Sequence, residues 1–171
     1  MKEHFPRALT GPKATGKFIK ALVDIGFTPE NTLYADSSCP DEINHDDPSE
    51  DITGLMQHHW GAIFPLSGLA GVPFAGATGW AAFSSHIPKD GNCVVLFAPH
   101  VGVHTDGTIG IVKREGQEHT TSACGAAIGA LKALRANPKT AQNPGMIDQQ
   151  MDTIKHLLLP HVDAISRAEN E

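Results

Sequence analysis

The chain has 171 residues, 40% of them hydrophobic, and a formal net charge of −6. This length predicts one domain over residues 1–171, and the acidic balance with scattered Lys and Arg argues against nucleic-acid binding. No apolar run approaches the roughly 20 residues that cross a bilayer, and the first residues lack the apolar core of a signal peptide. We therefore expect a cytoplasmic protein without a membrane segment. With three cysteines lacking disulfide spacing and ten histidines, we expect free thiols or metal ligands.

The first predicted element is a helix over residues 16–26. Its apolar face is predicted to consist of Phe18, Leu22 and Ile25, which recur at helical spacing. Gly26 follows as a natural helix end. The segment "NTLYA", residues 31–35, then predicts a strand, and the acidic, turn-rich residues 36–54 predict a loop.

A second helix is predicted over residues 78–87, with Thr78 as its N-cap and Pro88 beyond its end. The uninterrupted apolar run "CVVLFA", residues 93–98, predicts a strand buried on both faces, as in a parallel sheet, with Cys93 in the core. The dipeptide Asp106-Gly107 then predicts a hairpin turn between two short strands.

Two helices are predicted in the last third of the chain. The first lies within residues 122–138, and the second, amphipathic one within residues 144–162. Because helices interleave with buried strands, the sequence predicts an α/β fold with a mainly parallel central sheet flanked by helices. The apolar stripes of the two helices are Ala127, Ile128, Leu131 and Leu134, and Ile147, Met151, Ile154 and Leu158.

Three side chains able to bind a metal follow predicted strands or precede a helix. The run "NTLYA" leads to Cys39, "CVVLFA" leads to His100, and Cys124 precedes the helix within 122–138. Ligands of open α/β sheets bind at the carboxyl ends of strands, so these side chains can meet. Two thiolates and an imidazole suit zinc, and three protein ligands leave the open position of a catalytic site. The alternatives are ordinary structural roles: a buried thiol, a strand end and close helix packing.

Four segments resemble the limiting-carbon-dioxide-inducible protein B/C family, which is related to the theta-class carbonic anhydrases. They are "GFTPENTLYADSSCPDEIN", "FPLSGLAGVPFAGATGWAAFSSHIP", "LFAPHVGV" and "SACGAA", in the family's order over roughly residues 4–135. The resemblance implies a fold like that of beta-class carbonic anhydrases and a homodimer. It also implies a zinc ion held by Cys39, His100 and Cys124, with water in the fourth position.

The resemblance further implies that Asp41, two places after the first cysteine, orients the zinc-bound water, steered by an arginine. The chain departs from the expected pattern at two places, because Pro40 and Ile43 stand where arginines are expected. We therefore predict Arg114 as the partner of Asp41, with Arg7 as the alternative.

The leading hypothesis for function is zinc-dependent, reversible hydration of carbon dioxide to bicarbonate and a proton. One alternative is a catalytically silent zinc-containing homologue that acts as a bicarbonate-binding or assembly partner. Another is a metal-free enzyme with Cys39 or Cys124 as nucleophile and His100 as base. The residues predicted to line the substrate pocket or relay protons are Phe64, Leu66 and Phe83, and His86 and His104.

Overall fold

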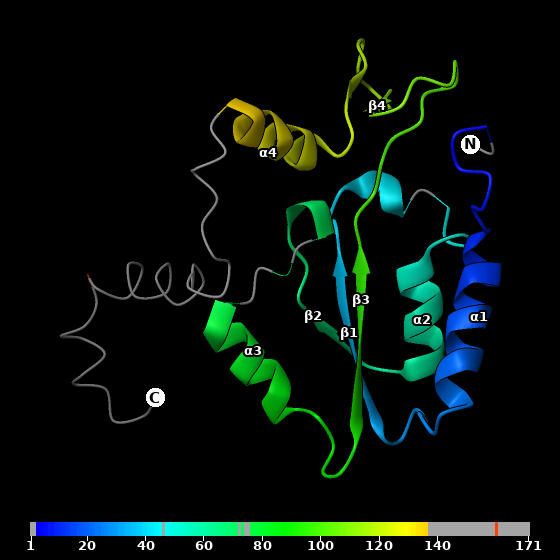
Figure 1. The fold of residues 1–171 in the computed structure, drawn as a ribbon, viewed down its shortest axis with the longest axis vertical. Coiled ribbons are helices and arrows are strands. Elements are labelled where there is room, and N and C mark those ends of the chain that lie inside the picture. Colours follow the sequence, from blue (N-terminus) through cyan, green and yellow to red (C-terminus); the bar gives the residue numbers. More distant parts are fainter. Residues whose placement is uncertain (1–2, 46, 72, 74–75, 137–159, 161–171) are drawn as a thin grey trace.

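The computed structural model describes residues 3–45, 47–71, 73, 76–136 and 160, and Figure 1 shows how their elements are arranged. The helix predicted within residues 144–162 lies outside these described residues, residue 160 apart. No helix in the described part of the chain is long and apolar enough to cross a membrane.

A parallel sheet forms the centre of the fold, with helices on both of its faces (Figure 1). Its strands are β1 (Thr32–Ser38), β2 (Ile63–Pro65) and β3 (Asn92–Ala98), in the order β2–β1–β3. Both neighbours run parallel to β1. The predicted α/β class with a mainly parallel sheet is therefore confirmed.

Helices α1 (Gly11–Val23) and α2 (Ile52–Trp60) cover one face of the sheet. They pack around Tyr34, which is fully buried between Met56 and Trp60 of α2. Adjacent strand residues point to opposite faces, so Ala35 belongs to the other layer. There it packs with Leu66 and Phe83, the latter from helix α3 (Gly76–Ser85).

The predicted face of the first helix is right at Leu22 and wrong at Phe18 and Ile25. Phe18 is 50% exposed and Ile25 is 70% exposed, whereas Ile19 and Leu22 pack against the core of Tyr34, Met56 and Trp60. The helix begins at Gly11, five residues before the predicted start, and its first amide donates to Glu50 Oε2 at 2.6 Å. This contact with the segment before α2 helps set the rotation of α1, which its own apolar residues leave ambiguous.

Helix α2 begins inside the segment predicted as a loop, and the sequence reading missed both it and β2. Asp51 caps the helix, because its Oδ1 accepts a hydrogen bond from the backbone nitrogen of Thr53 at 2.9 Å. The predicted N-cap Thr78 lies inside α3, which begins two residues earlier at Gly76.

The expectation that the strand at residues 93–98 is buried on both faces is also wrong. Cys93 is exposed rather than in the core, and Phe97 is 53% exposed. The reason is that β3 lies at the edge of the described sheet, so one face of the strand is only partly covered.

The remaining described elements are short, apart from one helix. Asp106-Gly107 forms a turn as predicted, but in place of the two short strands expected beside it there is one isolated antiparallel bridge between Val103 and Ile109. The helix predicted within residues 122–138 is present as α4 (Gly125–Ala136), and Leu131 of its predicted apolar stripe is 47% exposed. These elements are the 3-10 turns η1 (Glu42–Asn44) and η2 (Leu69–Gly71), the antiparallel pair β4 (Ile111–Val112) and β5 (Thr121–Ser122), and helix α4 (Gly125–Ala136).

Candidate metal centre

Cys39 lies directly after β1, at the carboxyl end of the sheet. Its backbone nitrogen donates to the carbonyl of Ala98 at 3.3 Å, which continues the pairing of β1 with β3 by one residue. Its own carbonyl accepts a hydrogen bond of 2.6 Å from Asn44 Nδ2 in η1. The side chain is 1% exposed. Hydrogen bonds on both sides of the residue therefore fix the position of this thiol.

His100 follows the end of β3 by two residues, which places it beside Cys39 at the same end of the sheet. Its side chain is only 11% exposed. Within the described residues, neither ring nitrogen has a hydrogen-bond partner. Because buried polar atoms are nearly always hydrogen-bonded, an imidazole whose two nitrogens have no protein partner is available to bind a metal ion.

Cys124 is brought to the other two residues by a backbone network that ties the segment after His100 to the start of α4. The amide of Gly102 donates to the carbonyl of Ala123 at 2.8 Å, and the amide of Gly110 donates to Gly102 at 2.8 Å. A Cβ atom at Gly102 would lie 2.8 Å from the carbonyl oxygen of Ile111, so only glycine allows this approach. Cys124 follows Ala123 directly and is 5% exposed.

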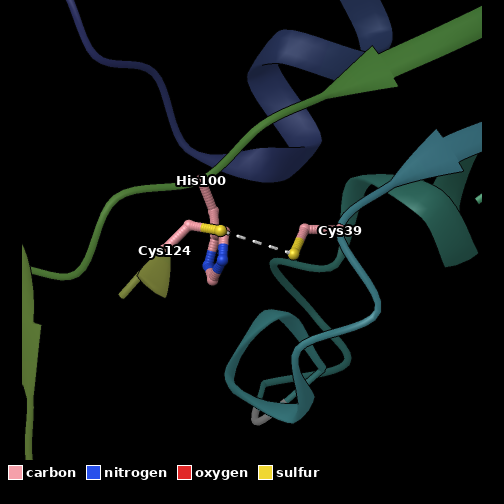
Figure 2. A group of neighbouring side chains, drawn as sticks. All are labelled: Cys39, His100 and Cys124. Atoms are coloured by element: carbon pink, nitrogen blue, oxygen red, sulfur yellow. Dashed lines mark hydrogen bonds between the residues drawn. The ribbon is translucent and has the colours of Figure 1, made fainter. Parts of the chain in front are cut away.

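The three predicted ligands thus converge, although they come from distant parts of the chain (Figure 2). Their ligand atoms all lie within 4.8 Å of one another, and the two sulfurs are 3.8 Å apart. Two sulfurs each about 2.3 Å from a tetrahedral zinc are about 3.8 Å apart, whereas a disulfide holds them at about 2.0 Å. The spacing and the donor set of two thiols and one imidazole therefore fit a zinc ion.

The turn η2 supplies a hydrogen bond to one of these sulfurs. The amide of Ala70 lies 3.3 Å from Cys39 Sγ, in position to donate to a thiolate. The next residue, Gly71, has a φ of 71°, and a Cβ atom there would lie 2.7 Å from the backbone nitrogen of Pro99. Close packing at Gly71 therefore holds the Ala70 amide against Cys39. It also fixes the position of η2 relative to the segment that leads to His100.

Asp41 lies beside the three ligands. Its Oδ2 atom is 3.6 Å from His100 Nε2, which is too far for a hydrogen bond. Arg114 reaches both of its oxygens through Nη2, at 2.9 and 2.7 Å, whereas the alternative, Arg7, is an exposed residue. Burial raises the pKa of Asp41, but hydrogen bonds, chiefly from Arg114, outweigh it and hold the pKa below its usual range. Asp41 is therefore ionised at neutral pH.

The residues predicted to line a substrate pocket or to relay protons make contacts outside the group of three ligands. Leu66 and Phe83 belong to the core with Ala35, and Phe64 packs against them. His86 Nδ1 is 2.8 Å from the carbonyl of Ala82. His104 Nδ1 pairs with the carboxylate of Asp106 in the same loop. The roles of all these residues in a substrate pocket or proton relay stay predictions.

Four supporting residues escaped the sequence reading. Asn44 and Ala70 contact Cys39, while Glu42 and Thr121 contact Arg114. Glu42, Asn44 and Ala70 lie in segments that carry the family resemblance, and only Thr121 lies outside them. Asn44 and Ala70 act on a partner 5 and 31 positions away, and no short sequence pattern signals such contacts.

Comparison with known proteins shows the family of the chain. The family described as limiting CO2-inducible proteins B/C beta carbonic anhydrases matches residues 8–171, a range that includes every residue of the site. The crystal structure of PtLCIB4, a homolog of the limiting CO2-inducible protein LCIB, is 34% identical with a TM-score of 0.69, over 99% of this chain and 68% of that chain. The crystal structure of LCIB is 26% identical with a TM-score of 0.60, over 86% of this chain and 56% of that chain. No curated protein matches the chain.

Proposed function

Because the chain belongs to the limiting CO2-inducible protein B/C family of beta carbonic anhydrases, we propose that it catalyses the reversible hydration of carbon dioxide. The products are bicarbonate and a proton. The observation that carries this proposal is the convergence of Cys39, His100 and Cys124 beside the ionised Asp41. We further propose that the protein acts as a homodimer in the cytoplasm, as the family resemblance and the sequence composition lead us to expect.

In the proposed site, the two cysteines and one ring nitrogen of His100 would hold a zinc ion. Zinc held there would lower the pKa of water, so that hydroxide, the nucleophile for carbon dioxide, would be available near neutral pH. The amide of Ala70 neutralises part of the negative charge on Cys39 by donating to its sulfur. The burial of both cysteines keeps bulk water away from the metal–sulfur bonds.

Asp41 is proposed to accept a hydrogen bond from the attacking water. As a carboxylate with Oδ2 3.6 Å from His100 Nε2, it lies beside the metal ligands and can accept but not donate. The water is then held with its lone pair directed toward carbon dioxide. Arg114 fixes the carboxylate and keeps it charged, because its guanidinium contacts both oxygens.

The silent-homologue alternative depended on the absence of an arginine next to Asp41 in the sequence. Arg114, 73 positions away, contacts Asp41 and removes most of the reason for that alternative. The metal-free thiol alternative has less support. Among the described residues, no hydrogen bond joins His100 to either thiol, whereas a nucleophile and its base are expected to form one.

The test of the proposed function is stopped-flow hydration of carbon dioxide by the zinc-loaded protein, with bound zinc measured on the same sample. We expect about one zinc per chain and a rate above that of buffer at neutral and mildly alkaline pH. A fully loaded protein without any rate above buffer would favour the silent homologue. Activity that survives complete removal of the metal would favour the thiol mechanism.

A further inference from the structure

The guanidinium of Arg114 has a separate partner for each of its three nitrogens. Nη2 donates to both oxygens of Asp41, Nε donates to Glu42 Oε1 at 2.6 Å, and Nη1 donates to Thr121 Oγ1. The side chain is 16% exposed. Among these partners, Thr121 has no place in the proposed chemistry and does not carry a charge.

The contact with Asp41 does not by itself fix the plane of the guanidinium. Arginine and a carboxylate are most strongly aligned when two different nitrogens face two oxygens in a fork. Here both oxygens of Asp41 approach the same nitrogen, Nη2. The group can therefore rotate about this contact unless its other nitrogens are held.

The two other contacts differ in how firmly they can hold the group. Glu42 is 67% exposed, and an ion pair with an exposed carboxylate contributes little because water competes with it. Thr121 is half-buried in β5, opposite Val112 of β4, and Arg114 follows Val112 by two residues. The β4–β5 pairing and the restricted rotamers of a β-branched side chain thus fix the hydroxyl relative to the arginine.

We propose that Thr121 is a positioning residue that fixes the plane of the Arg114 guanidinium and, through it, the orientation of the Asp41 carboxylate. Its effect on the rate rests on the proposed function, whereas its effect on Arg114 does not. Thr121 also lies three residues before Cys124. The short segment between Thr121 and the start of α4 therefore carries both one proposed metal ligand, Cys124, and the residue that anchors the partner of Asp41.

The matched variants are Thr121→Val, which keeps the branched shape and loses the acceptor, and Thr121→Ser, which keeps the hydroxyl. Ser122→Ala, at the exposed neighbouring position, is the control for changes in β5 itself. Should Thr121→Val fail to fold, Thr121→Ala removes the same acceptor with a smaller side chain.

The first measurement is NMR of protein labelled with ¹⁵N-arginine, which reports rotation of the guanidinium and exchange of its protons with water. The Arg114 signal is identified by its loss in Arg114→Lys. We expect slow rotation and protected protons in the wild type, Thr121→Ser and Ser122→Ala, and fast rotation in Thr121→Val. Wild-type protection in the folded Thr121→Val variant overturns the proposal.

The second measurement is steady-state hydration with zinc content determined in parallel. We expect kcat of Thr121→Val to fall roughly 10- to 100-fold, as for other residues that orient a metal site, with zinc content and KM unchanged and with rescue by Thr121→Ser. A fall that Thr121→Ser fails to rescue, or one that follows loss of zinc, contradicts a positioning role. If the wild type itself is inactive, the proposed function fails, and the NMR result still decides whether Thr121 fixes Arg114.

Discussion

The two ends of the β1–β3 pair are packed in the same way, but they differ in whether their polar side chains have hydrogen-bond partners among the described residues. At the amino end, a Cβ atom at Gly91 would lie 2.6 Å from the carbonyl oxygen of Asn31, and at the carboxyl end a Cβ atom at Gly71 would lie 2.7 Å from the nitrogen of Pro99. At each end, a glycine thus packs directly against the backbone of a neighbouring segment. The glycines show where the chain packs tightly, and they do not distinguish a site from a simple turn.

The hydrogen bonds separate the two ends. At the amino end, the side chain of Asn31 accepts a hydrogen bond from the amide of Thr28 at 2.9 Å and donates one to the carbonyl of Gly26 at 3.0 Å. Nearby backbone groups therefore supply its hydrogen-bond partners. At the carboxyl end, both nitrogens of His100 lack a partner among the described residues, and two thiols lie beside them.

Single unpartnered polar atoms also occur in the core where α1 and α2 pack on the sheet, for example Tyr34 Oη and Trp60 Nε1. They differ from His100 because no group of potential metal ligands surrounds them among the residues that the structure covers. Convergence of several ligand atoms, rather than one unsatisfied atom, therefore distinguishes a site from ordinary packing.

The largest effect is expected from Cys124→Ser, compared with Cys93→Ser. Residues that only orient metal ligands change affinity by about 10- to 100-fold, so removal of a ligand should weaken zinc binding by more than about 100-fold. Cys93 is exposed at the amino end of β3, and its replacement should leave affinity unchanged. Zinc content and competition with a chelator measure both variants. Equal zinc retention in the two would contradict the metal centre.

The next largest effect is expected from Asp41→Ala. This variant should keep its zinc, because Asp41 is not one of the three ligands, and should lose about 100-fold or more in kcat, as for the loss of a group that handles a proton. Asp47→Ala is the control, since Asp47 is an exposed acid that bonds to Ser49 in the same loop. Stopped-flow rates check the prediction. An unchanged rate in Asp41→Ala would remove Asp41 from the mechanism.

A smaller and more selective effect is expected from one methyl group placed at each end of the strands. Gly71→Ala and Gly91→Ala should each lower the free energy of unfolding by about 1–3 kcal/mol, because both force a Cβ atom against backbone. Only Gly71→Ala should also weaken zinc binding, by about 10-fold, because it displaces the Ala70 amide from Cys39. Denaturant titration gives the stability change and chelator competition the affinity change. Equal zinc affinity in both variants would show that η2 does not support the metal site.

The sequence predicts the features of this fold that depend on neighbouring residues. The apolar runs before Cys39 and His100 form β1 and β3, and a Gly- and Ala-rich segment forms α4. Since the carboxyl ends of parallel strands meet at one edge, the ligand candidates could be named from their positions after strands and before a helix. Strand ends followed by polar residues are a local signal, which explains why the sequence could predict that these three side chains meet.

The features that the sequence did not reveal depend on contacts between distant segments. The rotation of α1 depends partly on Glu50, 39 positions from Gly11. The exposure of Cys93 depends on β3 lying at the edge of the described sheet. The contact between Ala70 and Cys39 requires a turn that no motif marks. In each case the residues are compatible with several arrangements, and tertiary packing selects one.

The distance along the chain between the two cysteines has a consequence for folding. Cys39 and Cys124 are 85 positions apart, and an ion bound by both would close a loop through half of the protein. Loop closure of this kind lowers the conformational entropy of the unfolded chain, and a ligand that binds only the native state adds its binding free energy to stability. Metal bound at the carboxyl edge of the sheet would then stabilise the whole fold, and the supply of metal would regulate the lifetime of the folded protein.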